Sequence, residues 1–146
     1  MAIATNATMV QPSTDGSSRF QWVKAQTLTS SDQTVGLVGF AAVSQAVIYA
    51  KSSSVSGTSP TMDIYVQRLL PDTTTWHDIA HFTQFTGNAN RVMSMVTGGN
   101  KEEAQQAGSL AAATINSVAF GSTWRLSVVI GGTTPSFVLD VYVETQ

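Results

Sequence analysis

The chain has 146 residues and a formal net charge of -2; 42% of the residues are hydrophobic, 11% are charged and none is cysteine. A chain of this length is expected to fold as one domain that buries roughly 70% of its unfolded surface without a disulfide or a metal. The lack of cysteine excludes a disulfide framework and a thiolate site, and the few, nearly balanced charges disfavour a nucleic-acid surface, which needs clustered Lys and Arg. Ser and Thr make up about a quarter of the chain. This composition predicts a β-rich, non-enzymatic domain that needs no cofactor.

Residues 1–18 are small and polar and show no apolar period. They lack the basic segment and the continuous apolar stretch of a secretory signal, so we expect the protein to be cytoplasmic when it is made. The most apolar stretch, residues 35–50, falls short of the roughly 20 residues that span a bilayer. We therefore expect no membrane anchor.

Two interpretations of residues 1–18 remain open. Chain ends are commonly disordered, which would make this segment a flexible tail. The alternative is an N-terminal arm that orders against a neighbouring molecule, with Met9 and Val10 as its apolar anchor and Gln11 and Pro12 beside them. Fully extended, such an arm could reach on the order of 60 Å.

From Arg19 onward, apolar and polar residues alternate with period 2 and are interrupted by Gly, Pro, Asn and Ser clusters, a pattern typical of strands and hairpins. The clearest predicted inward face belongs to Trp124, Leu126 and Val128, followed by Phe137 and its alternate neighbours. The expected strands are residues 19–27, 46–54, 62–70, 76–85, 91–97, 123–130 and 136–144. The expected turns are residues 56–60, 71–75, 87–90 and 131–135.

Seven or eight short strands with one buried face each predict an all-β fold: an antiparallel β-sandwich, jelly-roll-like, over residues 19–146. One segment departs from the pattern, the long connection 98–119. Asn100 could cap a short helix over residues 101–107, with Glu103 completing a capping box and Gly108 ending it. Residues 110–118 could add a further strand.

The sequence His77-Asp78-Ile79-Ala80-His81 has the spacing that places two histidines on one face of a helix, as in zinc sites. The surrounding residues alternate like a strand, however, and on a strand the two histidines would lie about 13 Å apart, too far to share one ion. We therefore expect solvated strand histidines and no metal site.

Other candidate motifs are incomplete. Residues 72–76 (DTTTW) resemble the Asp-box turn of some glycan-binding proteins, but they lack its glycine, and a simple turn is favoured. Residues 97–101 (TGGNK) lack the Walker spacing, and the serines have no nucleophile elbow. Trp22, Trp76 and Trp124 could stack on sugars, but core packing is favoured for all three, most strongly for Trp124.

Two stretches resemble a recurring pattern in small tailed-bacteriophage virion proteins. Residues 56–85 contain SGTSPTMDIYVQ, then LLPDTTTWHD and FTQF, and residues 120–144 continue with WRLSVVIGGTTPSF. The sequence departs from the pattern at Thr73, which stands where the pattern has a turn glycine, and the connection 98–119 has no counterpart.

The resemblance implies a virion structural protein of the capsid decoration or cement type. Such proteins are commonly jelly-roll or related β-sandwiches, often homotrimeric, and they sit on the outer capsid surface where several major capsid protein subunits meet. The expected lattice contacts are the arm, with Met9, Val10, Gln11 and Pro12, and the connection, with Lys101, Glu102 and Glu103. Another virion role (head fibre base, neck or tail) and a carbohydrate-binding or adhesive sandwich are the alternatives.

Overall fold

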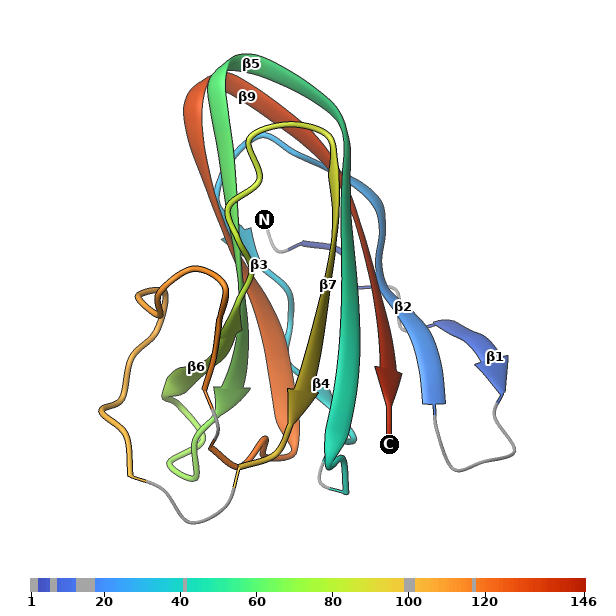
Figure 1. The fold of residues 1–146 in the computed structure, drawn as a ribbon, viewed down its shortest axis with the longest axis vertical. Coiled ribbons are helices and arrows are strands. Elements are labelled where there is room, and N and C mark those ends of the chain that lie inside the picture. Colours follow the sequence, from blue (N-terminus) through green and yellow to red (C-terminus); the bar gives the residue numbers. More distant parts are fainter. Residues whose placement is uncertain (1–2, 6–7, 13–17, 41, 99–101, 117) are drawn as a thin grey trace.

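The structure is a computed structural model that describes residues 3–5, 8–12, 18–40, 42–98, 102–116 and 118–146. In these ranges the chain is all-β, as expected: it forms one nine-stranded sheet with antiparallel strand pairs and contains no helix, hence none long and apolar enough to cross a membrane (Figure 1). The strands are β1 (Thr8–Pro12), β2 (Ser18–Leu28), β3 (Asp32–Gln33), β4 (Leu37–Val38), β5 (Gln45–Leu69), β6 (Trp76–His81), β7 (Ala89–Val96), β8 (Thr114–Ile115) and β9 (Thr123–Thr145).

Two long strands, β5 and β9, form the centre of the sheet. They pair with each other from Ala46 opposite Thr145 to Arg68 opposite Trp124. Both bend sharply at the same end of the molecule, so that the sheet has two arms (Figure 1). The first arm contains the first half of β5 and the second half of β9, and the second arm contains the remaining halves.

The bend corrects two predicted turns. Residues 56–60 and 131–135 are not hairpin turns, because each lies inside a continuous strand and faces the other across the β5–β9 pair. The register of this pair shifts repeatedly between Ser53 and Thr61. Gly57 and Gly132 there have φ values of 111° and 105°, which favour glycine. Bulges and left-handed residues bend a strand while its pairing continues, so the turn-like residues make a bend instead.

Further strands extend each arm outward from this central pair. In the first arm the order is β1-β2-β9-β5-β7. In the second arm, β3 and β4 pair with β9 on one side, and β6 and then β8 follow β5 on the other. The edges of the sheet are therefore β1 and β7 in the first arm and β3, β4 and β8 in the second.

The two arms contribute to a single core. Ile48 and Val141 of the first arm and Ile64 and Leu126 of the second belong to one cluster of buried side chains. Alternation along the strands supplies this cluster, because successive side chains point to opposite faces of a sheet. The predicted inward face of Trp124, Leu126 and Val128 is confirmed, and each of these side chains is at most 1% exposed.

The connection between β7 and β9 corrects a further prediction. Residues 102–107 do not form the expected helix, and the strand expected over residues 110–118 is reduced to Thr114–Ile115. The proposed cap, Asn100, and Lys101 lie outside the described residues. The backbone of this connection is bonded to β6 instead, starting with the N–H of Asp78 and the carbonyl of Gln106. A backbone that pairs with a neighbouring strand in this way does not need helical hydrogen bonds.

Candidate functional site

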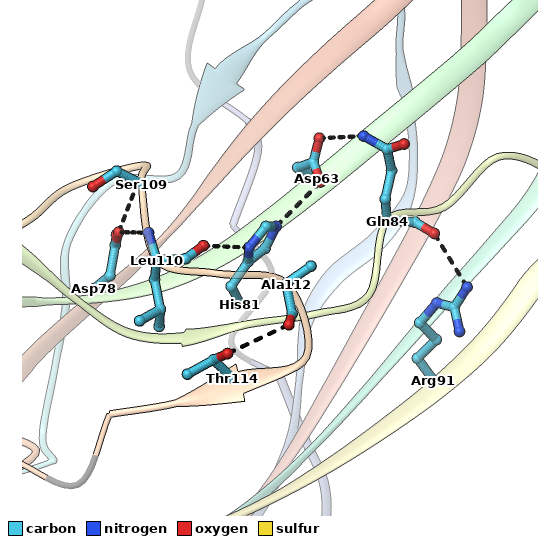
Figure 2. A network of polar contacts seen from close by, with 9 residues as sticks. All are labelled: Asp63, Asp78, His81, Gln84, Arg91, Ser109, Leu110, Ala112 and Thr114. Atoms are coloured by element: carbon cyan, nitrogen blue, oxygen red, sulfur yellow. Dashed lines mark hydrogen bonds and ion pairs between the residues drawn. The ribbon is translucent and has the colours of Figure 1, made fainter.

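The outer face of the second arm carries a buried cluster of polar side chains, which is centred on Asp78 of β6. The Asp78 side chain is fully buried. Its Oδ1 accepts hydrogen bonds from the N–H of Gly108 at 2.9 Å and from Nε2 of Gln67 at 2.8 Å. Its Oδ2 accepts from the N–H groups of Ser109 and Leu110 at 3.0 and 3.1 Å (Figure 2). One carboxylate thus holds three consecutive residues of the connection against the sheet.

His81 makes the second attachment between β6 and the connection. Its Nδ1 lies 2.7 Å from the carbonyl oxygen of Leu110, so this nitrogen carries a proton and donates it (Figure 2). Its Nε2 lies 3.1 Å from Oδ1 of Asp63, whose Oδ2 accepts a bond from Gln84. The His81 ring stacks on Tyr65 with a centroid distance of 3.9 Å. Burial, with a smaller contribution from the Asp63 and Asp78 carboxylates, raises the pKa of the Tyr65 phenol.

The prediction of solvated strand histidines was wrong, because His77 and His81 are each only 4% exposed. The β5–β6 register shifts between Val66 and Gln67, so Asp78, and not His77, shares a sheet face with His81. His77 accepts a bond from the N–H of Gln106 at 3.3 Å on its own side of the strand. In the described part of the chain, no group of three or more His, Cys, Asp and Glu side chains could hold a metal ion.

The DTTTW segment is the simple turn that was predicted. Oδ1 of Asp72 accepts hydrogen bonds from the N–H groups of Thr74 and Thr75, and Oδ2 accepts one from the Thr75 hydroxyl. The hydroxyl bond of Thr75, followed by the backbone bonds of Thr75 and Thr74, lowers the pKa of Asp72 to about 2. Both carboxylate oxygens of Asp72 therefore accept hydrogen bonds that close its own turn.

The tryptophans give little support to sugar stacking. Trp22 and Trp124 are fully buried, which confirms the core assignment for both. Trp76 is half-buried, and the guanidinium of Arg125 lies 4.3 Å from the centre of its ring. That face of the Trp76 ring is therefore already occupied by a cation–π contact.

The structure does not gather the predicted interface residues on one surface. Met9, Val10, Gln11 and Pro12 belong to β1, which pairs with β2 of the same chain at one edge of the first arm. Glu102 is exposed and Glu103 is half-buried, and both follow β7 in the connection; Lys101 lies outside the described residues. Figure 1 places β1 and the connection on opposite sides of the molecule.

Sequence reasoning missed a partly exposed apolar row on the outer face of the first arm, made of one exposed valine and two half-buried tyrosines. The strand register places Val92 of β7, Tyr49 of β5 and Tyr142 of β9 side by side across three strands. The two tyrosine rings lie 6.0 Å apart, and Val92 is 65% exposed. Val47 and Val96, at 37% and 62% exposed, lie on the same face: Val47 is next to Tyr49 along β5, and Val96 is separated from Val92 by Ser94 along β7. The signal for this face is an aromatic or β-branched residue at the outward-facing positions of paired strands, where polar residues are expected.

A shallow apolar pocket of about 230 Å³ adjoins the tyrosines. Tyr49, Tyr142 and Val47 line it, together with Phe20 of β2. The charged residues Arg19 and Glu144, which form an ion pair, lie at its border. On the other side of the tyrosines, the register places Lys51 opposite Asp140 on the same face. The face therefore has an apolar centre with residues of opposite charge facing each other on both sides.

Comparisons with known proteins give no relative that could assign a role to these residues. The chain matches no protein-family model, no curated protein and no solved structure.

Proposed function

We propose that this protein is a non-enzymatic structural protein of a virion, which decorates the outer surface of an assembled phage capsid. It would stabilise the shell by clamping neighbouring major capsid protein subunits. The proposed unit is a homo-oligomer, and the phage-type resemblance of residues 56–85 and 120–144 favours a trimer. Several simultaneous contacts from one oligomer would slow its dissociation from the lattice without high affinity at any single contact.

The proposed architecture is a two-layer, jelly-roll-like sandwich. In a sandwich, two sheets face each other and bury the alternate side chains of both. The bent sheet supports this interpretation, because side chains from both arms lie in one buried cluster. The outer faces of the two arms are then the two broad surfaces with which the protein could meet its neighbours.

The observation that carries the proposal is the outer face of the first arm. Protein interfaces are enriched in tyrosine and have few charges at their centre, and exposed apolar patches commonly mark such interfaces. The row of Val92, Tyr49 and Tyr142 meets both criteria. The outer face of the second arm differs, because the connection is bonded over its polar cluster around Asp78. We therefore assign lattice binding to the first arm.

Secondary contacts are proposed at the two sites that the sequence suggested. β1, with Met9, Val10, Gln11 and Pro12, lies at the edge of the same arm. Glu102 and Glu103 lie in the connection on the other side, and Lys101, which precedes them in the sequence, lies outside the described residues. Removing residues 1–18 should weaken capsid binding, as measured by co-sedimentation. The deletion also removes Ile3 from the core cluster, so circular dichroism must first show that the shortened protein is folded. Unchanged affinity of the folded deletion variant would remove the arm from the contact.

The test is co-sedimentation of the purified protein with assembled capsids and with free major capsid protein. We expect saturable binding to assembled capsids and none to the free subunit, because a clamp needs several subunits in their lattice positions. Tyr49→Ala and Tyr142→Ala should each weaken capsid binding about 30-fold, the effect of losing a contact worth about 2 kcal/mol.

Val129→Ala is the matched control. Val129 is 43% exposed on β9 in the other arm, so its truncation should leave capsid binding unchanged. A wild-type protein that ignored assembled capsids would contradict the decoration proposal. Equal binding by the tyrosine variants and the wild type would contradict the assignment of the face.

A carbohydrate-binding role is the second candidate, and one observation favours it. Tyr49 and Tyr142 form a half-buried aromatic pair beside a pocket bordered by Arg19 and Glu144, which could supply hydrogen bonds to sugar hydroxyls. A glycan array distinguishes the two roles. A reproducible sugar signal that is lost in Tyr142→Ala, together with no capsid binding, would favour the carbohydrate role.

A further inference from the structure

β7 is a sheet edge with space beside it. It pairs with β5 in an unbroken register from Ser52 opposite Ala89 to Gln45 opposite Val96. Among the described residues, no strand pairs with its other side. A groove of about 390 Å³ runs along that side, between residues 90–94 of β7 and a wall that includes Phe82 and Ile115. An added strand would find the unpaired backbone of β7 and an open groove beside it.

The sequence of β7 does little to block such pairing. Natural edge strands are commonly protected by lysine, proline, bulges or shortness. β7 has eight residues, no proline and no register shift. Its one charged residue, Arg91, bonds to the carbonyl of Gln84 and lies 5.0 Å from the centre of the Phe85 ring (Figure 2). This charge is held within the chain, and the strand exposes Val92 and Val96 instead.

The exposed residues of β7 are self-complementary. In antiparallel pairing of two identical strands, a two-fold axis at Ser94 places Val92 of each copy opposite Val96 of the other. It also places the arginines opposite Thr97, away from each other. Apolar β-branched residues stabilise a cross-strand pair, and like charges opposite each other destabilise it. Moving the axis to Val92 would instead bring Val96 opposite Asn88, beyond the end of the strand.

We infer that β7 is a docking edge for a second copy of this chain, with the two β7 strands paired antiparallel about an axis at Ser94. The pairing joins the first arms of two copies into one continuous sheet. It is an isologous contact, so it closes after two copies and does not grow into a fibre. The contact shares Val92 with the row that we assign to capsid binding, but it needs no capsid to form. If a trimer forms through another surface, β7 would link two trimers, and the total number of chains would still be even.

The test is the mass of the protein alone in solution, measured by light scattering and sedimentation equilibrium. The wild type should contain an even number of chains. The double variant V92K/V96K places like charges opposite each other at two positions across the contact, and its mass should be half that of the wild type. The double variant V92K/V96E places opposite charges at the same two positions, and its mass should return to the wild-type value.

Val129→Lys is the control for adding a lysine at an exposed strand valine, and its mass should equal that of the wild type. Circular dichroism and thermal melting show whether each variant is folded. An odd number of chains in the wild type, or an unchanged mass in folded V92K/V96K, would overturn the inference. Failure of folded V92K/V96E to associate would overturn the Ser94 register. Because no capsid is present, these outcomes are separate from those of the capsid-binding test.

Discussion

The Asp78 carboxylate is fully buried, and its hydrogen-bond donors come from two parts of the chain: the side chain of Gln67 on β5 and three backbone N–H groups, at Gly108, Ser109 and Leu110. A buried carboxylate is costly unless it is fully hydrogen-bonded, and buried N–H groups are costly without an acceptor. Each side of this contact therefore needs the other. The position of the connection depends on this one side chain more than on any local propensity.

Replacing Asp78 tests that dependence. Asp78→Ala should lower the free energy of unfolding by about 3 kcal/mol or more, because it leaves three N–H groups and an amide without their acceptor. Urea denaturation measures this loss. Glu102→Ala, at an exposed carboxylate of the same connection, should change the free energy by less than about 0.5 kcal/mol. Equal effects of the two substitutions would show that the Asp78 contacts do not hold the connection.

Asp72 predicts a specific pH dependence. The Thr75 hydroxyl and the N–H groups of Thr75 and Thr74 lower its pKa from 3.8 to about 2 in the folded chain. Because the folded pKa is depressed, the stabilisation is complete above the unfolded pKa and is lost as the pH falls from about 4 through about 2. The stability difference between the wild type and Asp72→Asn should therefore shrink over this window. An NMR titration of the Asp72 carboxyl with a midpoint near 3.8 would contradict this pH dependence.

The histidines show what sequence could and could not predict at this scale. The alternation around His77 and His81 correctly predicted a strand. It did not predict the bulge that moves Asp78 onto the face of His81, nor the segment that covers both. Burial of a strand face depends on what packs against it, and here that is a connection some 30 residues later in the chain, where Asp78 binds the N–H of Gly108.

At the scale of elements, the bend in β5 and β9 determines the shape of the molecule. The two strands approach most closely at the bend. A Cβ atom at Gly132 would lie 2.6 Å from the carbonyl oxygen of Ser59, and one at Gly57 would lie 2.7 Å from the carbonyl oxygen of Thr134. The glycines are needed both for their left-handed φ and for this close approach. The bend brings the two arms together over one core.

Gly132 and Gly39 have nearly equal φ values, but only Gly132 is close to an opposite strand. Replacing each glycine therefore separates the cost of the left-handed φ from the cost of the close approach. Gly132→Ala and Gly39→Ala both force alanine into a conformation near φ 105–109°, which costs on the order of 1–3 kcal/mol. At Gly39 no atom lies within 4 Å of the added Cβ, whereas at Gly132 the opposite strand must move. Gly132→Ala should therefore be less stable than Gly39→Ala by at least about 2 kcal/mol in urea denaturation. Equal losses would show that the close approach is not needed.

The strands were predicted well where apolar and polar residues alternate regularly, and the segments that connect these stretches were predicted poorly. The alternation of apolar and polar residues correctly predicted which side chains of residues 62–66 and 124–128 face the core. Residues 56–60 and 131–135 have the composition of hairpin turns, and local sequence does not reveal that they lie opposite each other in one continuous ladder. The helix over residues 101–107 was predicted from capping residues alone, but tertiary hydrogen bonds to β6 decided the described part of that segment.

At the scale of the whole molecule, the two outer faces of the bent sheet differ in what covers them. The second arm presents its polar cluster to the chain's own connection. The first arm presents Val92, Tyr49 and Tyr142 to the outside. Sequence patterning did not predict this contrast, because it depends on where the connection returns. It is the contrast from which we assign the first arm to binding.

The sparse charge predicts how binding responds to salt. Only 11% of the residues are charged, and the charges beside the apolar row occur in pairs such as Arg19 with Glu144. Screening by salt acts on exposed charges over about 10 Å at 0.1 M and leaves apolar contacts intact. The affinity for capsids should change less than about threefold between 0.05 and 0.5 M salt. A tenfold or larger loss, measured by co-sedimentation, would indicate an electrostatic contact elsewhere on the surface.

The decoration proposal is tested most directly by the number of copies of this chain in a purified virion, measured by quantitative mass spectrometry against the major capsid protein. A protein that clamps subunits across a whole lattice must be present in hundreds of copies, in a fixed ratio to the major capsid protein. The proposal predicts that ratio. A few copies or a dozen would contradict it and would place the protein at a vertex, the neck or the tail.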